Sequence, residues 1–533
     1  MDHIASAASA VHSALTARRF QYQPLSGSAS AWRRFLDPLD VVMAPKNRRK
    51  LQFTLVSMAS LLVFAVLIGM RYLFSSPSLL STSIKPFIVN RSPHHPHGSS
   101  SACYDCMYMA TPSLWGQYSP MFSVPSELCA DVPPKCTLTF GQVLSRHGAR
   151  DPTSSKTVEY NRTIQRIHDS VTEYGEAVKF LRNYTYSLGA DHLTKFGQDE
   201  MMVSGVNFFQ RYKSLAASSV PFIRASGQQR VVESALNWTQ GFYAARVSHG
   251  IDPVGESKGK LLIIPEGDTS NNTLNNGLCT ALESGKYSQV GDDAKDAFLA
   301  TFIEPITARL NLNLPGANLT NKEAVYMMDL CPFNTVATAD ATVSEFCLLF
   351  TIEDWRNYDY YQTMDKYYGH GNGNPMGATS GVGWANELIA RLTDTPVVDH
   401  TSVNHTLDSS NATFPLGRAL YADFSHDNDM TGIFSALRLY DATPLLPTDR
   451  RVAPEEAGGF ASSWVVPFAA RMYVEKMRCE GESEEFVRFL VNDRVIPLVD
   501  CGVDKFGRCK LSKWVDTMGF AQSGGNWSEC FSS

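Results

Sequence analysis

The sequence predicts an α/β fold, in which strands of a buried sheet alternate with helices. Residues 137–144 form a run of apolar and β-branched side chains that is typical of a buried strand. Residues 420–424 alternate as a short strand does, and apolar residues at helical spacing follow at 430–437. Around 221–231, an apolar strand end passes through a Ser-Gly turn into a helix start. Polar residues follow each strand, at the edge where open α/β sheets bind ligands.

Composition limits the class of protein. The chain has 533 residues, and 44% of them are hydrophobic, so it can bury a large core and divide into two domains. The net charge of −6 argues against a general nucleic-acid binder, although it does not exclude a local basic pocket.

The amino-terminal part contains a predicted targeting signal. Residues 1–50 are predicted to be a disordered cytosolic tail that ends in a basic cluster. Residues 51–70 form a stretch without charged residues, and this stretch is long enough for a helix to span a bilayer. We therefore predict a signal anchor at 51–74, with everything after it lumenal or outside; a cleaved signal peptide is the alternative. Residues 75–105, rich in Ser and Pro, are predicted to be a linker.

Sequons and cysteines support this orientation. Every N-x-S/T sequon follows the apolar run, and all 11 cysteines follow residue 100, as expected for an oxidising compartment of the secretory pathway. Cys103 and Cys106 form one C-x-x-C without a second pair at zinc-ligand spacing. Cys501 and Cys509 bracket a short turn and could form a bridge locally. The odd number of cysteines leaves at least one thiol outside the intrachain bridges.

The first strand ends in Arg146-His147-Gly148-Ala149-Arg150. The two arginines can make forked contacts to phosphate oxygens, and Gly148 lets the backbone approach a ligand closely. His147 lies between two permanent cations, which disfavour its protonated form and leave a neutral, nucleophilic ring. A bare RHG tripeptide is more often an arginine-rich turn with a solvated histidine, so the rest of the chain must supply a proton donor and further phosphate ligands.

The longer string Leu144–Arg150 with Pro152 resembles the histidine acid phosphatases, and within them the fungal phytase (3-phytase) branch. Residues 423–428 (DFSHDN) resemble the proton-donor motif of that family, and residues 115–118 (WGQY) resemble a segment of its substrate pocket. The resemblance runs from about 114 to 531. It implies a phosphoglycerate-mutase-like α/β domain with a mixed sheet (106–182 and 370–533), an inserted, mainly α-helical domain (183–369), and a site between them.

The resemblance also implies roles for single residues. His147 is the expected nucleophile and Asp427 the expected proton donor. The expected phosphate and substrate contacts are Arg146, Arg150, Arg230, His426, Gln117, Tyr118 and Lys366. Arg224 competes with Arg230 for the role of third arginine, and a surface ion pair is the alternative for either. Asp365 stands where some relatives carry a lysine, and Asn275 where several carry an acidic residue, so the substrate preference stays open.

The implied mechanism is phosphoryl transfer to His147, protonation of the leaving alkoxide by Asp427, and hydrolysis of the phosphohistidine. The arginines supply the positive charge, so no metal or cofactor is expected. We predict a phosphomonoesterase that acts on phytate (myo-inositol hexakisphosphate), with N-glycans and a membrane anchor but no nucleic-acid partner. A broad-specificity acid phosphatase and a phosphoglycerate-mutase-like transferase are alternatives. A membrane-anchored surface protein with a relic site is the non-enzyme alternative, which the intact set of site residues disfavours.

Periodicity predicts helices at 156–182, 198–212 and 382–392, a strand at 471–479, and the start of a further element at 486–491. The resemblance further suggests the pairs Cys136–Cys479, Cys279–Cys530 and Cys331–Cys347. Cys103, Cys106 and Cys129 remain unassigned.

Overall fold

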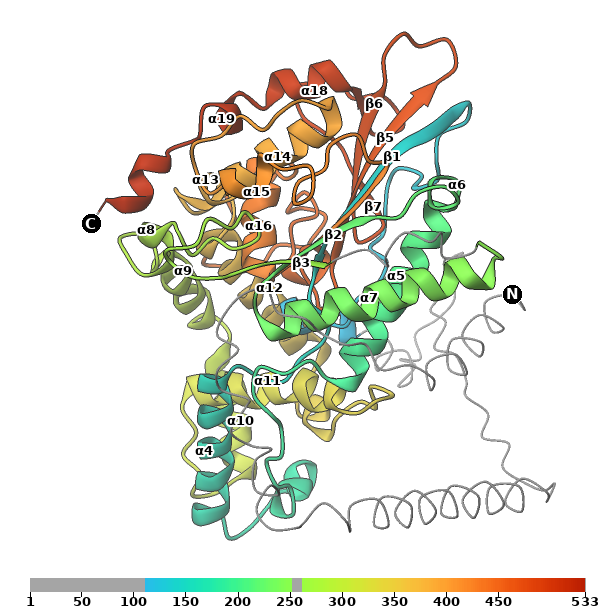
Figure 1. Cartoon of the computed structure of the whole chain (residues 1–533). Helices are drawn as coiled ribbons and strands as arrows, with labels where there is room; N and C mark the ends of the chain where they lie inside the picture. The colour runs from blue at the N-terminus through green and yellow to red at the C-terminus, as the bar shows by residue number, and fades with distance from the viewer. Residues whose placement is uncertain (1–110, 252–260, 533) are drawn as a thin grey trace, which may run out of the picture. The chain divides into compact units, whose positions relative to one another are not determined.

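The computed structural model describes residues 111–251 and 261–532 (Figure 1). The predicted tail, the anchor at 51–74 and the linker all lie outside the described residues, as do Cys103 and Cys106. Within the two described stretches, no helix is both long and apolar enough to cross a bilayer.

A mixed sheet forms the centre of the described part, as predicted. Its strands are β1 (Cys136–Arg146), β2 (Phe222–Ser226), β3 (Leu261–Ile264), β4 (Leu420–Ser425), β5 (Arg471–Cys479), β6 (Phe486–Val491), β7 (Arg494–Ile496) and β8 (Arg508–Lys510). The order is β3-β2-β4-β1-β5-β6-β7, and β8 pairs with β6. β1 is parallel to β4 and antiparallel to β5. The strand predicted at 471–479 is confirmed as β5, and the element expected to begin at 486 is the strand β6.

Helices surround the sheet. The α-helices are α4 (Ser154–Ser170), α5 (Lys195–Arg211), α6 (Lys213–Ala216), α7 (Gln229–Ser248), α8 (Thr280–Glu283), α9 (Val290–Leu299), α10 (Ile303–Asn313), α11 (Asn321–Ala337), α12 (Ile352–Gly369), α13 (Gly377–Ser380), α14 (Val382–Thr393), α15 (His405–Asp408), α16 (Asp427–Ala436), α17 (Ser462–Val465), α18 (Leu511–Thr517) and α19 (Gly519–Gln522). Short 3-10 helices are η2 (Thr111–Leu114), η3 (Gly116–Tyr118), η4 (Glu176–Arg182), η5 (Glu345–Leu349) and η6 (Trp527–Phe531).

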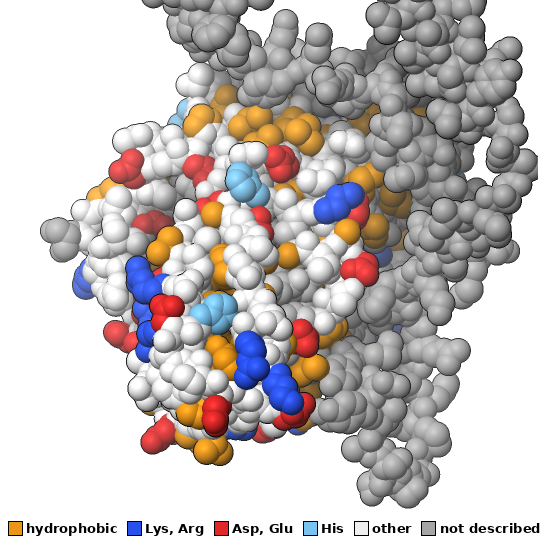
Figure 2. All heavy atoms as spheres, turned by 90° about the horizontal axis from the view of Figure 1, so that it is seen from below, with side chains coloured by type: hydrophobic (Ala, Val, Ile, Leu, Met, Phe, Trp, Pro, Cys, Tyr) orange, Lys and Arg blue, Asp and Glu red, His pale blue; other side chains and the backbone are white. Residues whose placement is uncertain are grey.

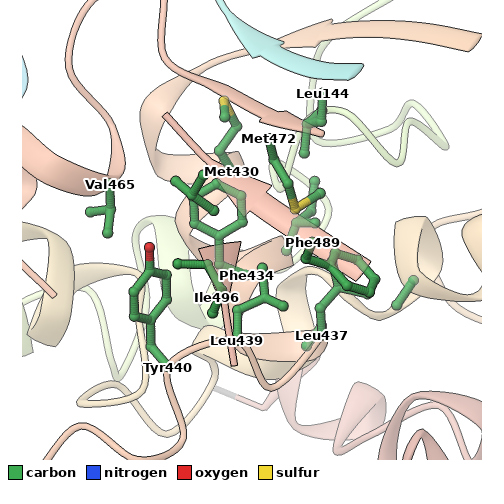
Figure 3. Close-up of a cluster of buried hydrophobic side chains, with 14 of the residues drawn as sticks. Leu144, Met430, Phe434, Leu437, Leu439, Tyr440, Val465, Met472, Phe489 and Ile496 are labelled. Atoms are coloured by element: carbon green, nitrogen blue, oxygen red, sulfur yellow. The ribbon is translucent and has the colours of Figure 1, made fainter. Parts of the chain in front are cut away.

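The sheet is buried on both faces because successive residues of its central strand point to opposite sides. Val143 packs into a cluster with residues of α5 and α7, whereas Leu144 packs into a second cluster with residues of α14 and α16. Figure 3 shows part of the second cluster, with Leu144, Met472 and Phe489 near Phe434 of α16. Val143 and Leu144 are fully buried, and each such side chain stabilises the fold by about 1.5–3 kcal/mol.

Helices α5 and α7 approach each other closely because both carry a glycine at the contact. A Cβ at Gly205 would lie 2.0 Å from the backbone oxygen of Trp238, and one at Gly241 would lie 2.0 Å from that of Met202. The helix predicted at 198–212 corresponds to α5, which begins at Lys195 and buries Met201, Phe208 and Phe209.

A third cluster contains few sheet residues and joins α4, α10, α11 and the start of α12 (Figure 1). The helix predicted over 156–182 is wrong as one element: α4 ends at Ser170, and η4 follows at Glu176–Arg182. β-branched Val171 is extended and Gly175 interrupts the helix, although Val178 and Leu181 still pack into the same cluster. The helix predicted at 382–392 is confirmed as α14.

The stretch 183–369, expected to be mainly helical, also contributes β2 and β3 to the sheet. The division into an α/β domain and an inserted domain stays a prediction. On the face shown in Figure 2, basic and acidic side chains of the described residues lie among one another.

Four disulfides are present in the described chain: Cys136–Cys479 and Cys279–Cys530 join distant segments, whereas Cys331–Cys347 and Cys501–Cys509 are local. The first of them joins β1 to β5 at the end of the sheet where β1 begins. The three pairs suggested by the resemblance and the local bridge are therefore confirmed. Among the described cysteines, Cys129 is free and exposed.

Candidate active site

The two strongest motifs leave the sheet at the same edge. β1 and β4 are parallel, and Arg146 lies opposite Ser425 in their register. His147 and His426 therefore follow neighbouring strands, and their ring centroids are 5.6 Å apart. The backbone N–H of His147 also donates to the carbonyl of Ser425 (3.1 Å). This arrangement matches the expectation that both motifs lie at carboxyl ends of strands.

The loop after His147 is held from two helices. The Gly148 N–H donates to the hydroxyl of Ser234 in α7 (3.1 Å), and the Ala149 N–H donates to the carboxylate of Glu200 in α5 (2.9 Å). A Cβ at Gly148 would lie 2.3 Å from the backbone oxygen of Gly197, so only glycine fits this approach. The loop is thus fixed before any ligand arrives.

His147 is a neutral base in this environment. Its Nδ1 lies 2.8 Å from the carbonyl oxygen of Gly148, which can only accept, so Nδ1 carries the proton and Nε2 holds the lone pair. Nε2 is buried and has no hydrogen-bond partner among the described residues. Burial, followed by the charges of Arg146 and Arg230, holds the pKa of His147 well below its usual 6.5. Sequence reasoning found the cations but missed burial, which is the larger cause.

Arg146 is a buried cation at the floor of the site. One Nη donates to the carbonyls of Gln117 and Val466, the latter at 2.8 Å. The other lies 3.4 Å from Oδ2 of Asp427, and the guanidinium stacks over Phe468 at 4.7 Å from the ring centroid. Burial lowers the pKa of Arg146 to about 10, so it stays charged in acid.

The two candidates for the third arginine, Arg224 and Arg230, lie in different surroundings. Arg224 is buried in the core, where it pairs with Asp423 (2.9 Å) and Glu387 (2.6 Å). Arg230 lies in the first turn of α7, reaches the pocket and contacts Asp191 at 3.2 Å. Burial, with repulsion from Arg150, lowers the pKa of Arg230 to about 10. The structure therefore places Arg230 at the pocket and Arg224 in the core, and the role of Arg230 as a phosphate ligand stays a prediction.

Asp427 begins α16, directly after His426. Its Oδ2 lies 2.8 Å from the ammonium of Lys366 and 3.4 Å from Arg146. Burial alone would raise the pKa of Asp427, but Arg146 and Lys366 outweigh burial and hold it well below 3.8. In the ligand-free protein Asp427 is therefore a carboxylate, clasped by two cations.

Glu266 is a site residue that sequence reasoning missed. It follows β3 at the same sheet edge, and its Oε1 lies 2.9 Å from Nε2 of His426. Burial opposes ionisation, but the contact with His426 lowers the pKa of Glu266 to about 2. The only local signal for Glu266 was the four-residue apolar run of β3 just before it. Nothing in the sequence links Glu266 to His426, which lies far along the chain.

A pocket of about 940 Å³ opens above these groups. Of the predicted site residues, it is lined by Gln117, Tyr118, Arg150, Arg230, Lys366, His426 and Asp427. His147 and Arg146 lie buried directly behind this lining. Lys156, Lys295 and Lys322 also line the pocket and were not predicted, nor were several carboxylates, among them Asp329 and Glu283. The lining contains six arginines and lysines and eight aspartates and glutamates, so the charge of the pocket is mixed.

The pocket-lining pair in η3 is held by packing. Gln117 donates from Nε2 to Gln362 (2.9 Å), and the ring of Tyr118 packs against Phe333 with centroids 4.7 Å apart. Lys366 contacts oxygens of Asn428, Asp365 and Asp427. Asn275 also lines the pocket.

Comparison with known proteins gives a consistent result. Residues 137–492 match the family described as the histidine phosphatase superfamily (branch 2). Phytase A of Aspergillus oryzae is 50% identical over 440 residues, covering 80% of this chain and 92% of the relative. Phytase A of Aspergillus fumigatus is 47% identical over 476 residues, covering 87% and 100%.

Solved structures share the fold. The crystal structure of the phytase from D. castellii has a TM-score of 0.63 at 22% identity, covering 79% of this chain and 87% of that one. The multiple inositol polyphosphate phosphatase of Bifidobacterium longum, solved with inositol hexasulfate, has a TM-score of 0.51 at 16% identity, covering 76% and 97%.

Proposed function

Because the chain belongs to branch 2 of the histidine phosphatase superfamily, we propose that it is a phytase, which removes phosphate from myo-inositol hexakisphosphate through a phosphohistidine. The observation that carries the proposal is the neutral Nε2 of His147, buried without a partner among the described residues and set between Arg146, Arg150 and Arg230. Full-length relatives named phytase A support the substrate. A 3-phytase regiochemistry follows from the resemblance and forms part of the proposal.

In the first step, a substrate phosphate takes the place that the Asp427 carboxylate occupies beside Arg146. Nε2 of His147 attacks phosphorus, and the arginines with His426 stabilise the charge that spreads over the non-bridging oxygens. The bond to the inositol oxygen breaks, and Asp427, now protonated, donates its proton to that oxygen. Water then attacks the phosphohistidine, Asp427 takes up a proton from it, and inorganic phosphate leaves.

Glu266 and the pocket wall assist this chemistry without touching phosphorus. Glu266 orients the His426 ring through its 2.9 Å contact. Gln117 accepts from Arg146 through its carbonyl and so ties the pocket wall to the phosphate site. Lys156 and Lys322 add positive charge at the pocket for the remaining phosphates.

The test is phosphate release by the purified full-length protein in EDTA, with phytate and p-nitrophenyl phosphate as parallel substrates between pH 3 and pH 8. We expect an acidic optimum below about 6, because Asp427 must be protonated. An acid-labile phosphoenzyme should form, and His147→Ala should abolish it. A phosphoenzyme that forms equally well in His147→Ala would overturn the mechanism.

A broad-specificity acid phosphatase is the second candidate. Acidic residues such as Asp365, Asp329 and Glu283 line the pocket beside its lysines, which weakens its pull on a highly anionic substrate. A higher kcat/KM for p-nitrophenyl phosphate than for phytate would favour this candidate.

We propose that the enzyme acts in the secretory pathway or outside the cell, held by the anchor at 51–74. The four disulfides of the described part support an oxidising compartment. Membrane fractionation with and without alkaline carbonate tests the anchor: an intact chain in the soluble fraction would mean no anchor, and a shortened chain there would mean cleavage.

A further inference from the structure

Charges of alternating sign lead from the outer pocket to the site. Lys295 in α9 lies 3.1 Å from the carboxylate of Asp365, which lies 3.0 Å from the ammonium of Lys366. Lys366 lies 2.8 Å from Asp427, and Asp427 lies 3.4 Å from Arg146. Lys366 is almost fully buried, and Lys295, Asp365 and Asp427 are each at least three-quarters buried, so water screens these contacts only weakly.

Lys366 has no free donor in the ligand-free protein. An ammonium carries three N–H groups, and three oxygens lie within 3.0 Å: those of Asp427 (2.8 Å), Asp365 (3.0 Å) and Asn428 (2.6 Å). A phosphate can accept a hydrogen bond from Lys366 only if the bond to one of these three partners breaks. Asp427 is the partner that the reaction requires to change, because it must pass from carboxylate to acid.

We propose that Lys295 and Asp365 are positioning residues for the proton donor, which set through Lys366 how readily Asp427 is released to take up a proton. This inference rests on the proposed function. Asp365 balances part of the charge of Lys366, and Lys295 balances Asp365, so the three residues together contribute one positive charge beside Asp427.

Further ionisable groups face Asp427 from the other elements and stay in place in the variants below. They are Arg146 at the end of β1, His147 after it, Arg230 from α7, His370 at the end of α12 and Asp429 within α16.

Removing Lys295 and removing Asp365 should shift the pH dependence of the reaction in opposite directions. Lys295→Met removes a positive charge, favours the protonated form of Asp427, and should shift the basic limb of kcat for phytate to higher pH. Asp365→Asn removes a negative charge, strengthens the hold of Lys366 on the Asp427 carboxylate, and should shift that limb to lower pH. At an effective dielectric of about 20, each shift should be on the order of 0.5–1 pH unit.

The double variant Lys295→Met/Asp365→Asn provides the internal check, because the net charge beside Asp427 is restored. Relative to the wild type, its basic limb should be shifted by no more than about a third of the shift seen in either single variant. A purely structural role would lower kcat in all three variants without opposite shifts. If Asp365→Asn does not fold, the direction of the shift in Lys295→Met decides alone.

A matched control is the exposed pair Lys195–Asp199 on the outer side of α5. Lys195→Met and Asp199→Asn change the net charge equally and should leave the profile unchanged. The inference would be overturned if the basic limbs of Lys295→Met and Asp365→Asn shifted in the same direction. It would also be overturned if the Lys195→Met and Asp199→Asn variants shifted theirs as far. Wild-type protein without phosphate release from either substrate would instead overturn the proposed function, so the two failures are distinguishable.

Discussion

Asp427→Asn should separate proton donation from binding. The side chain keeps its shape but loses its negative charge, which the structure places 2.8 Å from Lys366 and 3.4 Å from Arg146. Both cations then become free for the substrate, so KM for phytate should not rise. Loss of a general acid costs about 10²- to 10⁴-fold, or about 3–5 kcal/mol, when the leaving group is a poor one.

The assay compares kcat for phytate with kcat for p-nitrophenyl phosphate. An inositol alkoxide needs a proton to leave, whereas p-nitrophenolate is stable without one, so we expect a loss of at least 100-fold for phytate and under about 10-fold for the nitrophenyl ester. The basic limb of the wild-type profile should also disappear in the variant.

Protein stability provides the control for this comparison, since a misfolded variant loses both activities together. Circular dichroism and the melting temperature should therefore stay close to those of the wild type. Equal losses on both substrates by a folded variant would refute the acid role of Asp427.

Three further variants test other parts of the site. Arg224→Met should lower the free energy of unfolding by about 3–5 kcal/mol, because it leaves the buried carboxylate of Glu387 without a cation and that of Asp423 with Arg391 alone, while Arg230→Lys should lower kcat/KM without changing the melting temperature; the reverse pattern would mean that the wrong arginine faces the pocket. Gly148→Ala should lower kcat at least 100-fold, because its Cβ meets the backbone oxygen of Gly197 at 2.3 Å; full activity would contradict the close approach. His147→Asn should flatten the fall in melting temperature between pH 6.5 and pH 5: the wild-type pKa is depressed, so only the unfolded chain binds a proton there and stability falls as the pH falls; an unchanged slope would show that His147 is protonated in the folded state.

Much of the sheet could be predicted because its central strands are long apolar runs. β1, β4 and β5 each carry several consecutive buried residues, and the strands predicted there are confirmed, whereas at β6 only an element of unspecified type was expected. β3, β7 and β8 have only three or four residues, too few for a period to appear. The end of α4 was missed because the three-and-four spacing continues across an extended break at Val171.

The centre of the site was predictable because its residues form two compact motifs beside predicted strands. The surrounding residues were not, since each reaches the site from an element far along the chain. Glu266 extends from the end of β3, Glu200 from α5 and Lys295 from α9. Asp365 had been identified only as a departure from its relatives, and its pairing with Lys295 became visible only in three dimensions.

The parallel pairing of β1 with β4 also bears on how the enzyme acquires its activity. Residue 146 meets residue 425 only after the long intervening chain has folded back, and β1 must pair on its other side with β5, still further along. Such high contact order slows folding, because loop closure costs entropy before the distant contacts repay it. Turnover therefore reports the last stage of maturation: an incompletely synthesised or misassembled chain can bury much of its helical core and still have no means of attacking phosphorus.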